Sequence, residues 1–120
     1  MDKSILVVDD TRSMRKMVAG VLASAGYEVS EAADGAEALE LAQARQFDLV
    51  VTDHNMPRMD GVTLVRALRQ LSHYDAVALI VLSTEIDPVL KQKGREAGAT
   101  GWMVKPFDPQ RMLDIVAKFI

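Results

Sequence analysis

Short apolar runs alternate with longer segments of helical periodicity along the whole chain. Residues 4–8 form an almost unbroken apolar run, which is typical of a strand buried on both faces of a parallel sheet. Similar runs predict four further strands, at 27–31, 47–53, 77–82 and 101–104. Apolar residues that recur at helical spacing predict helices at 12–25, 34–45, 61–71, 87–98 and 108–120. The chain therefore reads as five successive strand–helix units.

Capping residues mark several of the predicted helix ends. Asp34 stands three residues before Glu37, which is the spacing of a capping box. Asp87-Pro88 and Asp108-Pro109 each place a cap before a proline at the first helical position. Gly94 lies inside the fourth predicted helix and costs about 1 kcal/mol relative to alanine, so this helix is expected to be the least stable.

Five strand–helix units with short connections predict an α/β fold, with helices on both faces of a parallel five-stranded sheet. The expected architecture is a doubly wound, flavodoxin-like (βα)5 fold with strand order 2-1-3-4-5. Ligands in such folds bind beyond the carboxyl ends of the strands, where the first and third strands lie side by side. Functional residues are therefore sought directly after the strands.

Three carboxylates follow the first and third predicted strands: Asp9, Asp10 and Asp53. Two like charges at ~4 Å repel by roughly 4 kcal/mol at an effective dielectric near 20, so such a cluster needs a cation or a proton. Each acid alone could simply cap the next helix. All three together, with Lys105 at the end of the fifth strand, favour a metal site. Because the donors are all oxygens, Mg²⁺ is expected, with Mn²⁺ as the alternative.

Two other polar residues stand at predicted strand ends or in the loops after them. Ser83 ends the fourth strand, where its hydroxyl is expected to point into the same crevice. His54 follows Asp53 in a loop rich in proline and glycine, and is expected to be an ordinary solvated loop residue.

Composition limits the classes of function. The chain has 120 residues, 49% apolar and 26% charged, with a net charge of −3, which is typical of one soluble globular domain. Its basic residues are scattered and its apolar runs are short, so we expect neither nucleic-acid binding nor membrane insertion. There is no cysteine and no signal-peptide pattern, so disulfides and thiolate sites are excluded and a cytoplasmic monomer is expected.

The motifs at the strand ends resemble the response-regulator receiver family. The match covers essentially the whole chain, and its motifs occur in order at the right spacings. They are Val7-Val8-Asp9-Asp10 with Ser13-Met14-Arg15, the loop 53–61, Ser83-Thr84-Glu85 and Val104-Lys105-Pro106-Phe107.

The resemblance implies roles for the charged positions. Asp53 would accept a phosphoryl group. Mg²⁺ would bind Asp10, Asp53 and the main-chain carbonyl of Asn55 directly, and Asp9 through a coordinated water. Lys105 would contact the phosphoryl group, and its bond to the following proline is a candidate for the cis form.

The resemblance also implies a switch. Ser83 would be the switch hydroxyl, and Trp102 would be the aromatic residue that follows its movement. Thr84 stands where a smaller residue is more usual, and together with Asn55 and Glu85 it would tune the lifetime of the phosphate. Trp102 replaces a commoner Tyr or Phe, so the hydrogen bond of a phenol is not expected here.

As a receiver, the chain would be a signalling switch that catalyses only its own phosphorylation and dephosphorylation. We expect a single domain over 1–120 with no output domain, phosphorylated by a sensor histidine kinase. Within the family it most resembles the stand-alone chemotaxis regulators, from its length, its Arg15-Lys16-Met17 segment and its Asn55/Glu85 pair. The surface of helix four, strand five and helix five would then act on a flagellar motor switch protein or a phosphatase. A phosphorelay intermediate or a phosphate sink is the alternative.

Two other classes fit the pattern less well. A haloacid-dehalogenase-like phosphatase also phosphorylates an aspartate, but it needs a second aspartate two residues later, where this chain has Asn55. A flavodoxin-like cofactor binder needs a phosphate loop rich in Gly, Ser and Thr after the first strand. Asp9-Asp10 would repel a phosphate there unless a metal ion intervened.

Overall fold

Five parallel strands form one sheet in the order β2-β1-β3-β4-β5, which confirms the predicted topology. The computed structural model describes residues 2–120. The strands are β1 (Ser4–Val8), β2 (Glu28–Ala32), β3 (Leu49–Asp53), β4 (Ala78–Ser83) and β5 (Gly101–Val104). The helices are α1 (Arg12–Ser24), α2 (Gly35–Ala44), α3 (Gly61–Leu68), α4 (Pro88–Ala97) and α5 (Pro109–Phe119), with a short 3₁₀ helix, η1 (Ser72–Tyr74).

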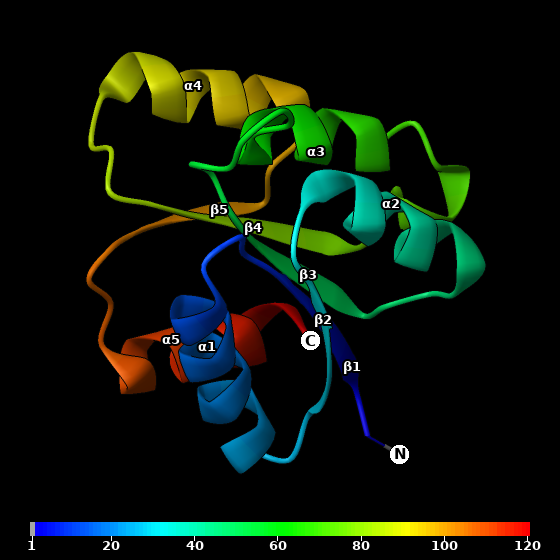
Figure 1. Cartoon of the computed structure of the whole chain (residues 1–120), viewed down its shortest axis with the longest axis vertical. Helices are drawn as coiled ribbons and strands as arrows, with labels where there is room; N and C mark the ends of the chain where they lie inside the picture. Colours follow the sequence, from blue (N-terminus) through cyan, green and yellow to red (C-terminus); the bar gives the residue numbers. More distant parts are fainter. Residues whose placement is uncertain (1) are drawn as a thin grey trace.

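The helices form two layers, one on each side of the sheet. Figure 1 shows α1 and α5 on one face and α2, α3 and α4 on the other. β1, β3 and β4 are buried along their whole length, and alternate residues serve the two faces: Leu79 and Val81 join the core under α3, and Ile80 and Leu82 the core under α5. Because these central strands are covered on both sides, their sequences are apolar without alternation.

The predicted caps are present. The side chains of Asp34, Asp87 and Asp108 each accept a hydrogen bond from a backbone N–H in the first turn of the following helix. Asp60 does the same for α3 through the N–H of Thr63. Each of these bonds satisfies one of the N–H groups that have no partner within the helix.

Some boundaries and burial expectations were wrong. α3 ends at Leu68 rather than at residue 71, because the chain turns there into η1. β3 starts at Leu49, since the N–H of Phe47 donates to the hydroxyl of Tyr74 rather than to a neighbouring strand. Helical spacing places Met17 on the apolar stripe of α1 next to Val18, but the Met17 side chain is 49% exposed. The apolar spacing of the last helix also predicts buried positions at Leu113 and Ile120, but these two are only partly buried, and the fully buried residues of α5 are Met112 and Val116.

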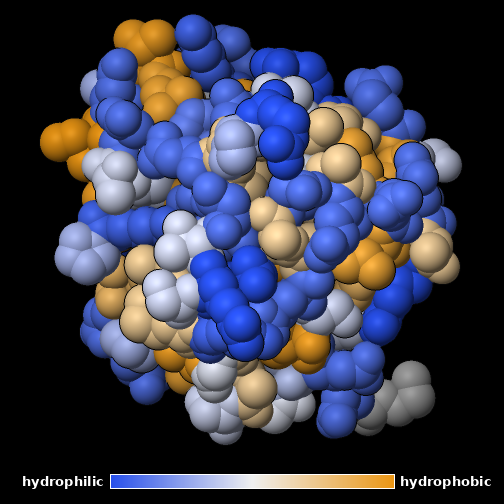
Figure 2. All heavy atoms as spheres, viewed as in Figure 1, coloured by the Kyte–Doolittle hydropathy of each residue, from blue (hydrophilic) through white to orange (hydrophobic). Residues whose placement is uncertain are grey.

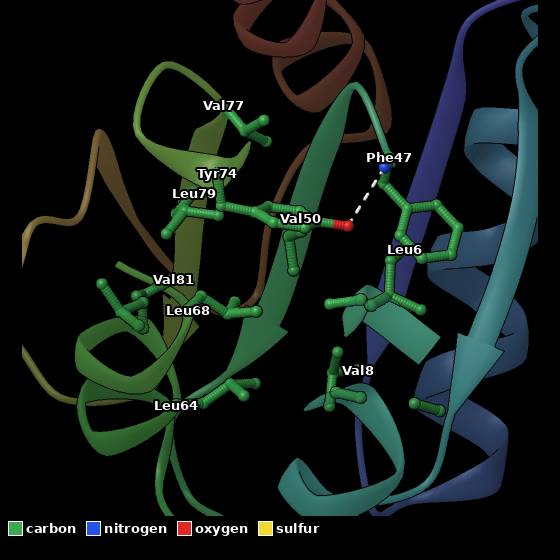
Figure 3. Packing of buried hydrophobic residues seen from close by; sticks show 14 of the residues in the cluster. Leu6, Val8, Phe47, Val50, Leu64, Leu68, Tyr74, Val77, Leu79 and Val81 are labelled. Atoms are coloured by element: carbon green, nitrogen blue, oxygen red, sulfur yellow. Dashed lines mark hydrogen bonds between the residues drawn. The ribbon is translucent and has the colours of Figure 1, made fainter. Parts of the chain in front are cut away.

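Tyr74 connects the core beneath α3 with the loop between α2 and β3. Its side chain is fully buried, and its hydroxyl donates to the carbonyl of Arg45 at 2.7 Å and accepts from the N–H of Phe47 at 3.1 Å. Figure 3 shows this ring among Val50, Leu79 and Val77, with its oxygen directed at Phe47. One hydroxyl thus satisfies two backbone groups of the loop between α2 and β3.

Tyr74→Phe is expected to lower the free energy of unfolding by about 1–3 kcal/mol, because it leaves a buried N–H and a carbonyl without their partner. Denaturant titration measures the effect. Tyr27→Phe, at the other tyrosine of the chain, is the control and should change the free energy by less than about 0.5 kcal/mol. Equal effects of the two substitutions would contradict this role for Tyr74.

Across residues 2–120, no helix combines the length and the apolar character that crossing a membrane requires.

Candidate functional site

The sheet register brings the predicted site residues to one edge. Val8 of β1 pairs with Thr52 of β3. Asp9 and Asp53 are the next residues along these two adjacent strands, so they stand at the same level of the sheet. Ser83 ends β4 opposite Val104 of β5, and Lys105 comes next. The carboxyl ends of four parallel strands therefore meet at one place, as the topology predicts.

Three carboxylates gather at this edge. Asp9, Asp10 and Asp53 each offer one oxygen, and these oxygens all lie within 4.8 Å of one another. Asp9 and Asp53 are buried, with 2% and 4% of their surface exposed, while Asp10 is exposed. The cluster thus has two buried members and one that faces solvent.

Lys105 supplies a positive charge inside the cluster. Its Nζ lies 2.6 Å from Oδ1 of Asp53 and 3.6 Å from Oδ2 of Asp9, and its side chain is 12% exposed. The peptide bond to Pro106 is cis, as the resemblance suggested. One lysine therefore faces three acids, and the site is short of positive charge.

The shortage of positive charge is seen at Asp9. Its Oδ1 accepts the N–H of Thr11 at 2.9 Å, but its Oδ2 is buried without a hydrogen-bond partner, since the contact with Lys105 is too long for one. Burial, and after it the charges of Asp53 and Asp10, raise the pKa of Asp9 above its ordinary value, although Thr11 and Lys105 act in the opposite direction. A buried carboxylate oxygen without a hydrogen-bond partner is suited to bind a cation.

The residues at this edge fit a Mg²⁺ ion. All donors are oxygens, the buried Oδ2 of Asp9 lacks a partner, and one acid is open to solvent. Mg²⁺ favours one or two carboxylates and keeps several of its waters, so this partly open arrangement suits it. Asn55 lies in the loop directly after β3, and the role of its main-chain carbonyl as a ligand of the ion stays a prediction.

Arg15 holds the turn that carries the first two acids. Its Nη1 donates to the carbonyl of Asp9 at 2.8 Å, and its Nε donates to Glu31 at 3.0 Å. Lys16 binds the other oxygen of Glu31. Burial opposes ionisation of Glu31, but these hydrogen bonds and charges lower its pKa below the ordinary value. Arg15 belongs to the Ser13-Met14-Arg15 motif, but the sequence did not predict its hydrogen bond to the carbonyl of Asp9.

Ser83 and Trp102 share the face of the sheet that α3 and α4 cover. Ser83 continues the alternation of Leu79 and Val81, and Trp102 pairs with Val81 across the strands. Ser83 is fully buried, and its Oγ accepts the N–H of Glu85 at 2.9 Å. Trp102 is partly buried and packs against the cluster beneath α3 and α4.

His54 was expected in solvent, and that expectation is wrong. Its side chain is buried, its Nδ1 accepts the N–H of Val62 at 3.4 Å, and its ring lies 5.8 Å from the ring of Trp102. The alternation of β3 continues for one residue past Asp53, which turns the imidazole inward. His54 therefore connects the acidic edge with Trp102.

The three predicted tuning residues flank the edge. Asn55, Thr84 and Glu85 are exposed, and Nδ2 of Asn55 lies 3.5 Å from Oγ1 of Thr84, at the limit of a hydrogen bond. Their effect on the phosphate stays a prediction.

Comparison with known proteins gives consistent matches. Residues 5–117 match the family model for the response regulator receiver domain. Chemotaxis protein CheY of Bacillus subtilis is 38% identical over 126 residues, covering 98% of each chain. The alkaline phosphatase synthesis transcriptional regulatory protein PhoP of the same organism is 39% identical over 113 residues, but this chain matches only 46% of its length. The chain thus spans about half the length of some curated relatives.

Solved structures agree. Chemotaxis protein CheY4 of Vibrio cholerae shows 45% identity and a TM-score of 0.96, with complete coverage of both chains. The receiver domain of sensor histidine kinase PA1611 from Pseudomonas aeruginosa shows 25% identity and a TM-score of 0.91, covering 99% of this chain and 98% of that one. That structure has a magnesium ion coordinated in its active site cleft.

Proposed function

The chain belongs to the response regulator receiver domain family, and from this premise we propose that it is a switch operated by phosphorylation of Asp53. Receiver domains are signalling switches that histidine kinases phosphorylate, rather than enzymes in the ordinary sense. The observation that carries the proposal is the position of Asp53, buried beside two further acids and in direct contact with Lys105.

The proposed reaction moves a phosphoryl group from a histidine of the kinase to Asp53. A carboxylate oxygen forms the new O–P bond while the N–P bond breaks, and the freed imidazole takes a proton. Such a transfer needs positioning and charge neutralisation more than covalent help. Bound Mg²⁺ would supply part of that neutralisation. Lys105 supplies the rest from within the protein, and Asp9, Asp10 and Asp53 would hold the ion.

The switch follows from a change in contacts. A phosphoryl group offers acceptors to both Ser83 and Lys105 that a free carboxylate does not satisfy together, and this difference biases an equilibrium between two arrangements. The Ser83 hydroxyl now accepts from Glu85, so its proton remains free to donate. Movement of Ser83 would then make room for Trp102 on the face that they share.

We propose the surface of α4, β5 and α5 as the output. A groove of about 430 Å³ there is lined by Trp102 and Phe107, and its charged lining residues are the basic Lys91 and Arg111 and one acid, Asp108. Ile86, just before α4, is 78% exposed, and Val89, in the first turn of α4, is 62% exposed. Figure 2 shows hydrophobic surface at the upper left, where α4 begins in Figure 1. An acidic partner segment with apolar side chains suits this surface, and the likeness to CheY favours a flagellar motor switch protein.

The experiment is a binding assay with motor-switch and histidine-kinase fragments, with and without phosphorylation. Phosphorylation should raise affinity for the motor-switch fragment by about 5–150-fold. The double substitution Lys91→Glu and Arg111→Glu should remove that gain. Lys3→Glu makes the same type of charge change just before β1, at the other end of that strand from Asp9, and should leave it intact.

Binding that ignores phosphorylation would reject the switch for that partner. Transfer of phosphate back to the kinase, without binding of a motor-switch fragment, would favour the phosphorelay or phosphate-sink alternative.

A further inference from the structure

Gly94 in the middle of α4 is buried and lies against the six-membered ring of the Trp102 indole. A Cβ at this position would stand 2.8 Å from Cζ3 and 3.0 Å from Cε3 of that ring, closer than carbon atoms approach. The backbone of Gly94 does not have the positive φ of Gly98, so its conformation does not require glycine. Close contact with Trp102 therefore accounts for a residue that weakens the helix.

The ring of His54 also lies beside the indole of Trp102. The ring centroids are 5.8 Å apart with the planes tilted by 44°. His54 is held in place through its N–H to Leu82, its carbonyl to Gly61 and its Nδ1 to Val62. His54 is also the residue next to Asp53. A shift of the backbone at Asp53 therefore moves the His54 ring, which lies beside the indole.

We propose that Gly94 and His54 are positioning residues that form a seat for Trp102 and hold the indole in the unphosphorylated arrangement. The structure shows this unphosphorylated arrangement, in which Nζ of Lys105 lies 2.6 Å from Oδ1 of the free Asp53 carboxylate. The functional part of this inference rests on the proposed function above. Filling the seat displaces the indole and moves the equilibrium toward the switched arrangement.

Gly94→Ala is the direct test, and Gly20→Ala is its matched control. Gly20 lies in α1, is exposed, and a Cβ there would have no neighbour within 4 Å. Gly20→Ala should lower the unfolding equilibrium constant by up to about fivefold, through helix propensity alone. Gly94→Ala should raise it, because overpacking outweighs propensity.

Fluorescence reports the position of the indole, since Trp102 is the only tryptophan. Gly94→Ala should shift the emission to longer wavelength and increase quenching by acrylamide, whereas Gly20→Ala should change neither. His54→Ala, which removes the other contact, should shift the emission in the same direction. Emission unchanged in Gly94→Ala would overturn the seat, and emission unchanged in His54→Ala would remove His54 from it.

A double-mutant cycle separates the seat from a general cost of alanine at position 94. Tyrosine lacks the second fused ring of the indole and is narrower, so in a Trp102→Tyr background Gly94→Ala should become neutral or stabilising. An equal destabilisation in both backgrounds would contradict a specific contact with the indole.

Labelling by acetyl phosphate tests the functional part. Gly94→Ala should be labelled about 3–10-fold faster than the unsubstituted chain, because it already favours the switched arrangement. No labelling of the unsubstituted chain would reject the proposed function and leave the seat to be decided by fluorescence. Labelling at an unchanged rate, together with a shifted emission, would show that the seat does not control phosphorylation.

Discussion

Asp53→Asn is expected to abolish labelling of the chain by a small phosphodonor such as acetyl phosphate. The buried carboxylate of Asp53 is the only one that Lys105 contacts at hydrogen-bond distance among the described residues. An amide has the same shape but no anionic oxygen to attack phosphorus. Loss of labelling to background is therefore expected, measured as the fraction of protein that gains a phosphoryl group by intact-mass spectrometry.

The fold should survive this change. Asparagine keeps an oxygen that accepts from Lys105, and it removes one of several like charges, so the far-ultraviolet spectrum and the cooperativity of unfolding should be retained. Asp114→Asn makes the same substitution at an exposed position of α5 and should label normally. Continued labelling of Asp53→Asn would place the acceptor at another residue.

Asp9→Asn is expected to stabilise the metal-free protein while weakening its response to Mg²⁺. Burial and neighbouring acids raise the pKa of Asp9, so the folded state favours the protonated form. The stability this provides is present below the ordinary pKa of about 3.9 and is lost as pH rises through the raised value. At neutral pH the ionised group therefore costs stability, and asparagine should raise the free energy of unfolding above that of the unsubstituted chain.

Mg²⁺ should act on the two proteins differently. An ion that binds only the folded chain stabilises it by about 2.7 kcal/mol at a hundred times its dissociation constant. Asp9→Asn removes one of the charges that attract the ion, so its gain should be much smaller. Denaturation with a chelator and with excess Mg²⁺, at neutral and at acidic pH, measures both effects.

In the metal-free state, the advantage of Asp9→Asn should shrink as pH falls and Asp9 becomes protonated. Asp114→Asn should follow the unsubstituted protein under all of these conditions. A metal-free Asp9→Asn protein less stable than the unsubstituted chain at neutral pH would contradict the charge imbalance described here.

The fold was predictable because local signals agreed. Aspartates at positions 34, 87 and 108 mark helix starts, and continuous apolar runs mark strands that are covered on both faces. The repeated strand–helix unit and its right-handed connections predicted a parallel doubly wound sheet, and 2-1-3-4-5 was chosen as the leading order for an open sheet of five units. Since that order makes β1 and β3 neighbours, the convergence of Asp9, Asp10 and Asp53 followed as well.

The remaining features depend on contacts that are distant in sequence. His54 was placed in solvent from its polar loop, although the alternation of Val50 and Thr52 in β3 would have directed it inward. Gly94 was recognised as unfavourable, but nothing local names Trp102 as the ring that requires it. The bond from Arg15 to the Asp9 carbonyl depends on how α1 packs at the edge of the sheet.

The most direct test of the central claim is to map the phosphoryl group after reaction with acetyl phosphate, with Mg²⁺ and with a chelator. If the acids at the ends of β1 and β3 share one ion beside Lys105, the label appears on the peptide that contains Asp53 and requires Mg²⁺. A label on any other peptide, or the same yield on Asp53 with the chelator present, would contradict the account.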